Sequence, residues 1–270
     1  MFKWYGLAGI LLIIFTEINF FLKIEPFASW YFPIIWLGYI LVVDALIYKL
    51  KGSSLLVSRP KEAVLVFIGS FAFWNLFEIL NLFTMNWYYN VEFSMPARLI
   101  SAAFIFSALY ETYLLFRAVH LFDDVKLKKS RKIGKNFLYA MIFLGIVCLI
   151  APIMLEKYAF PLLWVSFFFF LDPINYVHKQ PSIIGHFKDR KMAVPLCLLL
   201  AGIIMGILWE FWNYWAVAKW FYEVPFIGFF KIFEMPLLGY IGYFPFAFEL
   251  YSMYWFTRSL FMKKEKLIAD

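Results

Sequence analysis

Apolar runs separated by short polar segments make up almost the whole chain. Eight of these runs are long enough to form helices that cross about 30 Å of hydrocarbon. The pattern predicts these helices at residues 5–23, 30–50, 63–86, 98–118, 136–155, 159–177, 193–217 and 238–259. The sequence therefore predicts an all-α integral membrane protein with about eight transmembrane helices.

The polar positions recur in the same order in the two halves of the chain. Glu78 and Asn81 are three residues apart, as are Glu210 and Asn213, and each pair precedes a Trp-rich end. The other matches are Asp44 with Asp172, Tyr48 with Tyr176, Lys51 with Lys179, Ser54 with Ser182, Met95-Pro96 with Met235-Pro236, and Glu111 with Glu249. This ordered series predicts two fused four-helix repeats in parallel orientation, related by an axis along the membrane normal.

The predicted boundaries are residues 1–125 for the first repeat, 126–135 for a basic cytoplasmic linker and 136–270 for the second repeat. The second repeat has an additional segment before its Met-Pro pair, FYEVPFIGFFKIFEM at 221–235. Its aromatic and apolar residues indicate a helix or re-entrant piece that lies in the outer interface and covers a cavity.

Composition and charge place the chain in the inner (cytoplasmic) membrane. It is 64% hydrophobic and 16% charged, whereas a soluble domain is about half apolar and a quarter charged. Of its 25 Lys and Arg residues, twenty fall on the side of the two termini, so both termini are predicted to be cytoplasmic. These cations are spread over short connections, so the net charge of +7 indicates no nucleic-acid partner. On the other side, Trp87 and Trp220 are typical of interfacial anchors.

Acids fall inside the predicted helices, whereas Lys and Arg do not. The seven acids are Glu17, Asp44, Glu78, Glu111, Asp172, Glu210 and Glu249. Both signs of charge cost a similar ~3 kcal/mol at the middle of a membrane helix, so the retention of anions alone indicates a role. One role is structural, as hydrogen bonds between helices, which contribute only ~0.6 kcal/mol on average. The alternative role is functional, because acids within membranes commonly form sites.

Two classes of function explain acids among abundant aromatic residues, which make up 23% of the chain. The first is an enzyme that protonates an isoprenoid or lipid substrate. A carboxylic acid in a dry pocket keeps its proton and can donate it, and aromatic faces stabilise the resulting carbocation. The second is a transporter or channel for protons or a cation, in which the acids bind or relay the charge.

The candidate residues for the first class follow from the repeat. The candidate catalytic residues are Glu78, Glu210, Glu111 and Glu249. The candidate substrate-binding residues are Asn81, Asn213, Asp44, Asp172, Trp209 and Trp212. Counting residues to Trp87 and Trp220 places Glu78 and Glu210 roughly 14 to 15 Å from the outer interface, in one shared cavity. The sequence has no nucleotide-binding loop, haem motif, membrane His or paired Cys, so neither a cofactor nor a metal is expected. The oligomeric state stays open.

One stretch of the second half, KWFYEVPFIGFFKIFEMPLLGYIGYFPFAFELYSMY, resembles the membrane-embedded lycopene cyclases and carotenoid hydratases. Those families carry a Trp-x-Tyr element followed by a Pro-Leu-Glu-Glu motif. Trp220-Phe221-Tyr222 matches the first element, whereas Leu238 and Gly239 replace the two motif glutamates. The resemblance implies isoprenoid chemistry, without the acids of the cyclase motif. The whole chain is similar to a family of bacterial polytopic membrane proteins, a similarity that implies no function.

Overall fold

Long apolar helices dominate the computed structural model, which describes residues 2–130, 132–225 and 228–262. Seven helical segments among these residues are long and apolar enough to cross a membrane. They are Trp4–Leu22, Tyr31–Lys51, Pro60–Thr84, Met95–Ala118, Lys135–Leu155, Phe160–Val177 and Ala193–Trp215. The chain is therefore a largely α-helical, multi-pass membrane protein.

The helices and strands follow one another in a similar order in the two halves. The first half contains α1 (Trp4–Leu22), α2 (Tyr31–Lys51), α3 (Leu55–Ser58), α4 (Pro60–Thr84), β1 (Trp87–Tyr89) and α5 (Met95–Ala118). The second half contains α6 (Lys135–Leu155), the 3-10 helices η1 (Glu156–Tyr158) and η2 (Phe160–Leu162), α7 (Leu163–Val177), α8 (Ile183–Lys188), α9 (Ala193–Trp215), β2 (Trp220–Tyr222), β3 (Lys231–Ile232), β4 (Met235–Pro236), η3 (Leu237–Gly242) and α10 (Tyr243–Phe261). Each half thus has two long helices, a short helix, a long helix, a strand and a last long helix.

The eighth predicted helix forms as α10, which is more polar than the seven apolar segments. It carries Glu249, Ser252 and Arg258, and all three side chains are buried. Helix α10 packs against α4, α7 and α9, so neighbouring helices cover these polar groups. Burial inside the bundle explains why a helix of lower hydropathy is found among apolar ones.

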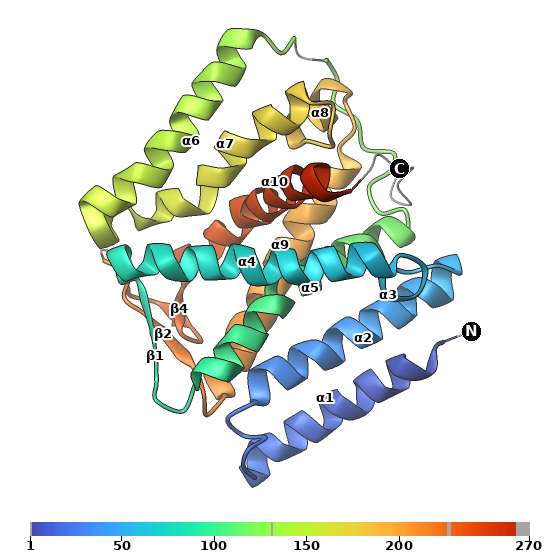
Figure 1. Ribbon diagram of the computed structural model, residues 1–270, viewed down its shortest axis with the longest axis vertical. Helices are drawn as coiled ribbons and strands as arrows, with labels where there is room; N and C mark the ends of the chain where they lie inside the picture. Colours follow the sequence, from blue (N-terminus) through green and yellow to red (C-terminus); the bar gives the residue numbers. More distant parts are fainter. Residues whose placement is uncertain (1, 131, 226–227, 263–270) are drawn as a thin grey trace.

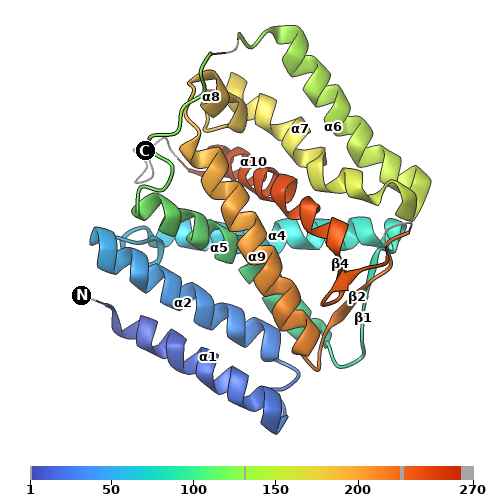
Figure 2. The ribbon, with the colours of Figure 1, turned by 180° about the vertical axis from the view of Figure 1, so that it is seen from behind.

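Helix packing follows the same scheme in both halves. Helix α1 packs on α2, α2 on α5, and α5 on α4, as α6 packs on α7, α7 on α10, and α10 on α9. The halves meet where α5 contacts α9 and where α10 contacts α4. Helices α1 and α6 lie at opposite edges of the molecule in both ribbon views (Figures 1 and 2).

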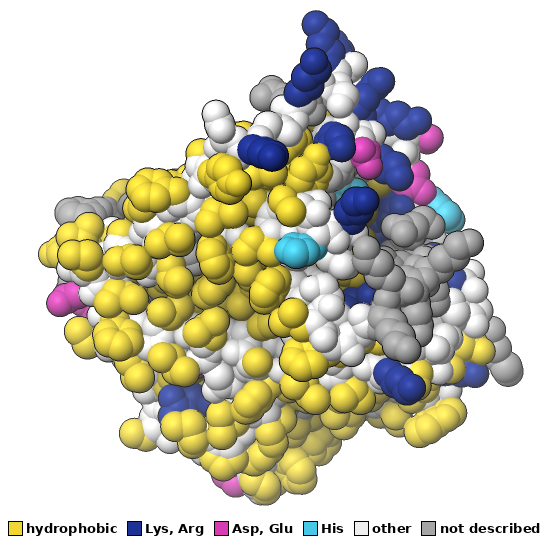
Figure 3. Space-filling model, turned by 45° about the horizontal axis from the view of Figure 1, so that its top comes forward, with side chains coloured by type: hydrophobic (Ala, Val, Ile, Leu, Met, Phe, Trp, Pro, Cys, Tyr) yellow, Lys and Arg dark blue, Asp and Glu magenta, His cyan; other side chains and the backbone are white. Residues whose placement is uncertain are grey.

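The two ends of the bundle differ in structure and in charge. The beginning of α1, the short helices α3 and α8, and the end of α10 lie at one end, and the strands lie at the other (Figure 1). Lys and Arg side chains gather at one corner of the face in Figure 3, whereas hydrophobic side chains cover most of the rest. Four of the cations used to predict the cytoplasmic side, Arg131, Lys263, Lys264 and Lys266, lie outside the described residues.

Prolines near the first turn set the beginnings of two helices. Helix α4 begins at Pro60 and α5 begins at Met95, followed by Pro96, so both begin three residues earlier than expected. Proline suits the first turn because its fixed φ fits the helix and its missing N–H is not needed there. The earlier beginnings bring Glu62 into α4 and Arg98 fully into α5.

The connection after α9 differs from the expected helix or re-entrant piece. Within its described residues it forms β2, then the short hairpin of β3 and β4, then η3. Phe226 and Ile227, which fall in this connection, lie outside the described part of the chain. Strand β2 pairs antiparallel with β1, so that Trp87 faces Tyr222, Tyr88 faces Phe221 and Tyr89 faces Trp220. Strands from the two halves are therefore joined directly.

The positions of two tryptophans also differ from expectation. Trp87 and Trp220 were expected as interfacial anchors, but each is only 5% exposed. Because α4 ends at Thr84 and α9 ends at Trp215, Glu78 and Glu210 lie only about 8 to 9 Å from the helix ends. The chain turns back after each helix, and the turn brings each tryptophan inside.

We expect reporter fusions at residue 90 and at residue 127 to lie on opposite sides of the membrane. Residue 90 follows β1, whereas residue 127 lies in the connection at the opposite end of the bundle. A fusion after Met262 should report the same side as residue 127, because α10 runs among the spanning helices. Two-sided reporter activity in cells measures this, and equal signals at residues 90 and 127 would overturn the arrangement.

Candidate functional site

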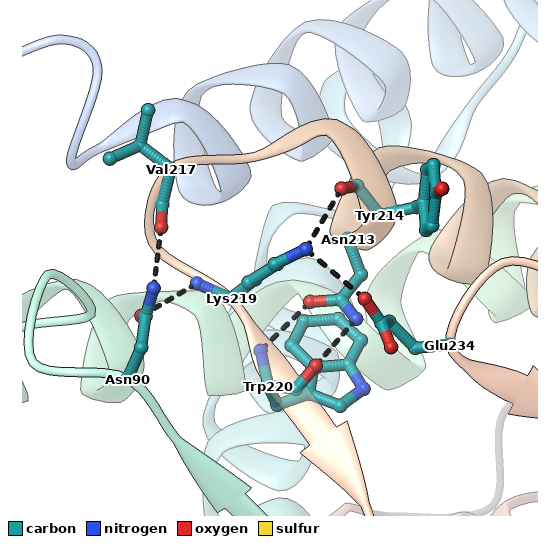
Figure 4. Close-up of polar contacts among 7 residues, drawn as sticks. All are labelled: Asn90, Asn213, Tyr214, Val217, Lys219, Trp220 and Glu234. Carbon is teal, nitrogen blue, oxygen red and sulfur yellow. Dashed lines mark hydrogen bonds and ion pairs between the residues drawn. The ribbon is translucent and has the colours of Figure 1, made fainter.

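The two asparagines of the Glu-x-x-Asn pairs bind the backbone of the strands that follow their helices. Asn81 Oδ1 accepts from the backbone N–H of Trp87 (3.3 Å), and its Nδ2 donates to the Trp87 carbonyl (2.8 Å). Asn213 makes the same two bonds with Trp220, each of 2.9 Å (Figure 4). Both asparagines were expected to bind substrate. In the structure their side-chain amides hold β1 and β2 instead.

The strand register explains why these amides are needed. Backbone bonds join Asn90 N–H to the Lys219 carbonyl and Glu223 N–H to the Asn86 carbonyl. Because bonded positions alternate along an antiparallel ladder, the polar groups of Trp87 and Trp220 face away from the partner strand. Each asparagine supplies the donor and the acceptor that the strand lacks on that side.

Contacts between the halves hold the start of β2. Asn90 Nδ2 donates to the Val217 carbonyl (2.7 Å), and Asn90 Oδ1 accepts from the Lys219 N–H (3.0 Å). The Lys219 ammonium group forms an ion pair with Glu234 at 3.1 Å (Figure 4). Strand β2 is thus attached to the first half on one side and to the segment before β4 on the other.

The two glutamates of the Glu-x-x-Asn pairs accept hydrogen bonds from tyrosines and a tryptophan. Glu78 Oε1 accepts from the Tyr89 hydroxyl and from Trp87 Nε1, the latter at 3.2 Å. Glu210 Oε1 accepts from the hydroxyls of Tyr222 (2.7 Å) and Tyr243 (2.6 Å).

The two acids differ in burial. Glu210 is fully buried, and its Oε2 has no hydrogen-bond partner among the described residues. Glu78 is only partly buried. Glu249 Oε2 and both carboxyl oxygens of Glu111 are also buried without a hydrogen-bond partner among the described residues.

A cavity of about 170 Å³ lies between the strands and the surrounding helices. The described wall is formed by Phe32, Trp74, Trp87, Tyr89, Phe93, Arg98, Ser101, Ile105, Phe160, Pro161, Trp164, Trp209, Trp220, Tyr222, Val224, Met235, Leu238, Gly239, Gly242, Tyr243, Pro245 and Phe246. Twelve of these residues are aromatic, and none is Asp or Glu. Some rings of the wall contact one another. The ring centroids of Trp74 and Trp209, for example, are 5.4 Å apart.

The predicted shared site is therefore corrected in one respect. Glu78 and Glu210 do not line the cavity. Instead, each lies behind it, bound to tyrosines that do line it: Tyr89 for Glu78, and Tyr222 and Tyr243 for Glu210. The tyrosine hydroxyls connect the buried acids to the aromatic wall.

The two candidate tryptophans have different positions. Trp209 lies in the wall of the cavity. Trp212 does not contribute to the wall. Its Nε1 donates to Glu17 at 3.1 Å, and its ring packs against Trp36 with centroids 4.8 Å apart. Trp212 and Glu17 thus join α9 to α1 and α2.

The two candidate aspartates lie at the opposite end of the bundle and cap short helices. Asp44 Oδ1 accepts from the Leu56 N–H at 2.9 Å, at the beginning of α3. Asp172 accepts from the N–H groups of Ile183 (2.8 Å) and Ile184 (2.9 Å), at the beginning of α8. A carboxylate at a helix N-terminus satisfies donors that have no partner within the helix. These contacts give both aspartates a structural role far from the cavity.

Glu111 and Glu249 are buried away from the cavity wall. Glu249 Oε1 accepts from the Phe167 N–H at 2.8 Å and from the Ser166 hydroxyl at 3.2 Å, which ties α10 to α7. The carboxyl group of Glu111 lies near that of Asp44. Neither glutamate is placed to contact a molecule in the cavity.

Sequence reasoning missed a buried ionic cluster around Glu62. Its carboxylate accepts from Arg59 at 2.9 Å and from the Tyr254 hydroxyl at 2.5 Å, and Arg258 Nε lies 3.5 Å away. Pro60 was the available signal, since a proline in the first turn places Glu62 inside α4. The cluster joins α4 to α10, one in each half.

Comparison with protein-family models, curated proteins and solved structures finds no match for this chain. Within the described residues, no three His, Cys, Asp or Glu side chains are grouped as metal ligands would be.

We expect Asn213→Ala to lower the thermal unfolding midpoint of the protein in detergent. The substitution leaves the backbone N–H and carbonyl of Trp220 buried without partners, and each such group costs about 1–3 kcal/mol. Asn75→Ala is the control, because Asn75 bonds only the Phe71 carbonyl of its own helix, in an exposed position. Equal shifts for the two variants would contradict the clamping role of Asn213.

Proposed function

We propose that this multi-pass membrane protein binds an isoprenoid or other lipid-type molecule in the aromatic cavity and acts on it by acid catalysis. One observation carries the proposal. The cavity wall is aromatic, and its tyrosine hydroxyls contact glutamates from both halves of the chain, partly buried Glu78 and fully buried Glu210.

The wall favours an apolar ligand. Sites for small molecules are concave and mostly apolar, with a few polar groups that fix orientation. Rings of Trp74, Trp164 and Trp209, which come from three different helices, surround the space. A molecule that dissolves in the bilayer would reach such a site from the membrane.

The proton would pass from Glu210 to the substrate through the hydroxyl group of one tyrosine. The Tyr222 or Tyr243 hydroxyl donates to Glu210 in the structure, so for this step it turns toward the substrate. It then gives its proton to one carbon of a C=C bond, and its oxygen takes a proton from the protonated Glu210 carboxyl group. The other carbon becomes a cation, which the surrounding ring faces stabilise. Loss of a proton from a neighbouring carbon, back through the same tyrosine to Glu210, forms a new C=C bond and restores the acid. The net reaction of these steps is an isomerisation. If a second C=C bond of the substrate first gives its π electrons to the cation and forms a ring C–C bond, the later loss of a proton completes a cyclisation, and neither reaction needs a further reactant.

A specific feature favours this reading over a proton or cation transporter. Glu78 and Glu210 lie behind the cavity near the strands, whereas Asp44, Asp172 and the Glu62 cluster lie at the other end of the bundle. A transport path requires carboxylates that line a route for the ion. No carboxylate belongs to the described cavity wall.

We also propose the finer organisation: eight spans, both termini cytoplasmic, and two parallel repeats at 1–125 and 136–270 joined by the linker 126–135. Matching contacts support the repeats. Asn81 and Asn213 each donate a hydrogen bond to the backbone of the strand that follows their helix. The pairing of β1 with β2 is symmetric about the Tyr88–Phe221 pair. On one side of that pair Trp87 faces Tyr222, and on the other side Tyr89 faces Trp220. Met1, Arg131 and residues 263–270, which belong to the proposed halves and linker, lie outside the described residues.

We expect cells that carry the gene to contain an altered lipid or isoprenoid, and Glu210→Gln to abolish that change. Glutamine keeps the shape and the hydrogen-bond acceptor but has no proton to transfer. Loss of a general acid typically lowers a rate by about 10²–10⁴-fold. Mass spectrometry of lipid extracts from cells with the wild type, with the variant and without the gene measures this.

Glu156→Gln is the matched control, because Glu156 is an exposed acid in η1 and does not line the cavity. Membrane insertion of each variant is checked by its yield and its elution in detergent. Identical extracts with and without the gene would contradict the enzymatic proposal. An unchanged product in Glu210→Gln would contradict the role of this proton.

A further inference from the structure

Building on the proposed function, we infer that the ligand of the aromatic cavity carries an anionic head group, a phosphate or a carboxylate, which Arg98 binds. Arg98 is the one cation among the described residues of the cavity wall. In the charge count of the sequence, Arg98 is one of the five Lys and Arg residues on the side opposite the termini.

The surroundings of Arg98 leave its charge without an anion. The central carbon of its guanidinium group lies 4.6 Å from the centre of the Tyr89 ring. Its Nε is shielded from solvent and has no hydrogen-bond partner within the described residues. No ion pair of Arg98 with a described carboxylate is found either; the nearby Glu78 is bound by the Tyr89 hydroxyl and Trp87 Nε1.

An arginine in this state is suited to an incoming anion. Removing a charged group from water is costly unless it gains a partner, and a partly shielded guanidinium group stays ready to accept one. Its planar array of N–H groups matches the two oxygens of a phosphate or carboxylate. Stacking on Tyr89 fixes the plane of the group while its N–H edges stay available.

Among the described residues of the wall, the cavity is cationic at one position, although the two halves share a pattern. Counting from the matched pairs Met95-Pro96 and Met235-Pro236, Leu238 occupies the position of Arg98, and both residues line the cavity. The ligand therefore meets a charge at the first-half side and apolar groups at the second-half side. An amphipathic molecule, with an anionic head and an apolar tail, fits this difference.

This orientation of the ligand also gives Glu78 and Glu210 different positions relative to it. Tyr89, which stacks under Arg98, is the tyrosine bound to Glu78. Glu78 thus lies beside the head group, and Glu210 lies on the side of the tail. Glu210 is the acid placed to act on C=C bonds of the tail.

Three probes with the same apolar chain test the inference: farnesyl phosphate, farnesoate and farnesol. Binding to the full-length protein in a neutral detergent is followed by tryptophan fluorescence, because Trp74, Trp87, Trp164, Trp209 and Trp220 line the cavity. We expect at least one anionic probe to bind about tenfold or more tightly than farnesol, as charged hydrogen bonds allow. The tighter of the two anionic probes identifies the head group as phosphate or carboxylate.

Arg98→Gln should remove the preference for the anionic probe and leave farnesol binding within about twofold of the wild type. Lys23→Gln is the control, because Lys23 is an exposed cation that follows α1 and does not line the cavity. It should keep the preference, which separates a specific contact from a general effect of positive charge. If Arg98→Gln does not fold, weakening of the wild-type preference by added salt tests the same contact.

The outcomes separate this inference from the proposed function. Equal binding of all three probes, unchanged in Arg98→Gln, would overturn the anionic head group and leave the apolar ligand in place. Failure of all three probes to bind would overturn the apolar ligand as well. A preference that Lys23→Gln also loses would show surface attraction and would overturn the assignment to Arg98.

Discussion

The structure depends on one constraint, the need to satisfy backbone polar groups where the chain leaves a helix and turns back inside the protein. Unpaired N–H and carbonyl groups are costly in a medium without water. Asn81 and Asn213 meet this need, because each donates to and accepts from a tryptophan of the following strand. The strands can therefore lie beneath the helix ends and pair with each other. Their pairing brings Tyr89 and Tyr222 to the glutamates one turn before each asparagine.

The acids in the helices thus separate into two roles that their sequence positions alone do not reveal. At one end of the bundle, Asp44 and Asp172 accept from backbone N–H groups and fix short helices. At the other end, Glu78 and Glu210 accept from side-chain hydroxyls at the edge of a cavity. Asp44 also accepts from the hydroxyls of Tyr5 and Ser54, and Asp172 from the hydroxyl of Ser252, but neither aspartate lies beside the cavity. Glu78 and Glu210 differ from them because the tyrosines that bind them line the cavity.

Hydropathy predicted the helices well because their length and apolar character are local properties of the chain. The spacing of Glu78 and Asn81, and of Glu210 and Asn213, also identified residues next to the cavity. The strands were missed, since three residues such as Trp87–Tyr89 carry no periodic signal and are held by distant partners. The cavity wall was missed for a similar reason. Trp164 and Phe246 lie far apart in the sequence. The packing of α7 against α10 brings the centroids of their rings to 5.1 Å from each other.

The two halves of the chain are alike at some matched positions and differ at others. Positions that hold the backbone are alike, because the strands of both halves have the same unsatisfied groups. Some positions that face the cavity are alike as well, such as Tyr89 and Tyr222, but Arg98 and Leu238 differ. A ligand with two identical ends would need no such difference, since each half would offer it the same surroundings. In the proposed function, this difference between Arg98 and Leu238 decides which end of an unsymmetrical ligand lies on the side of Glu210.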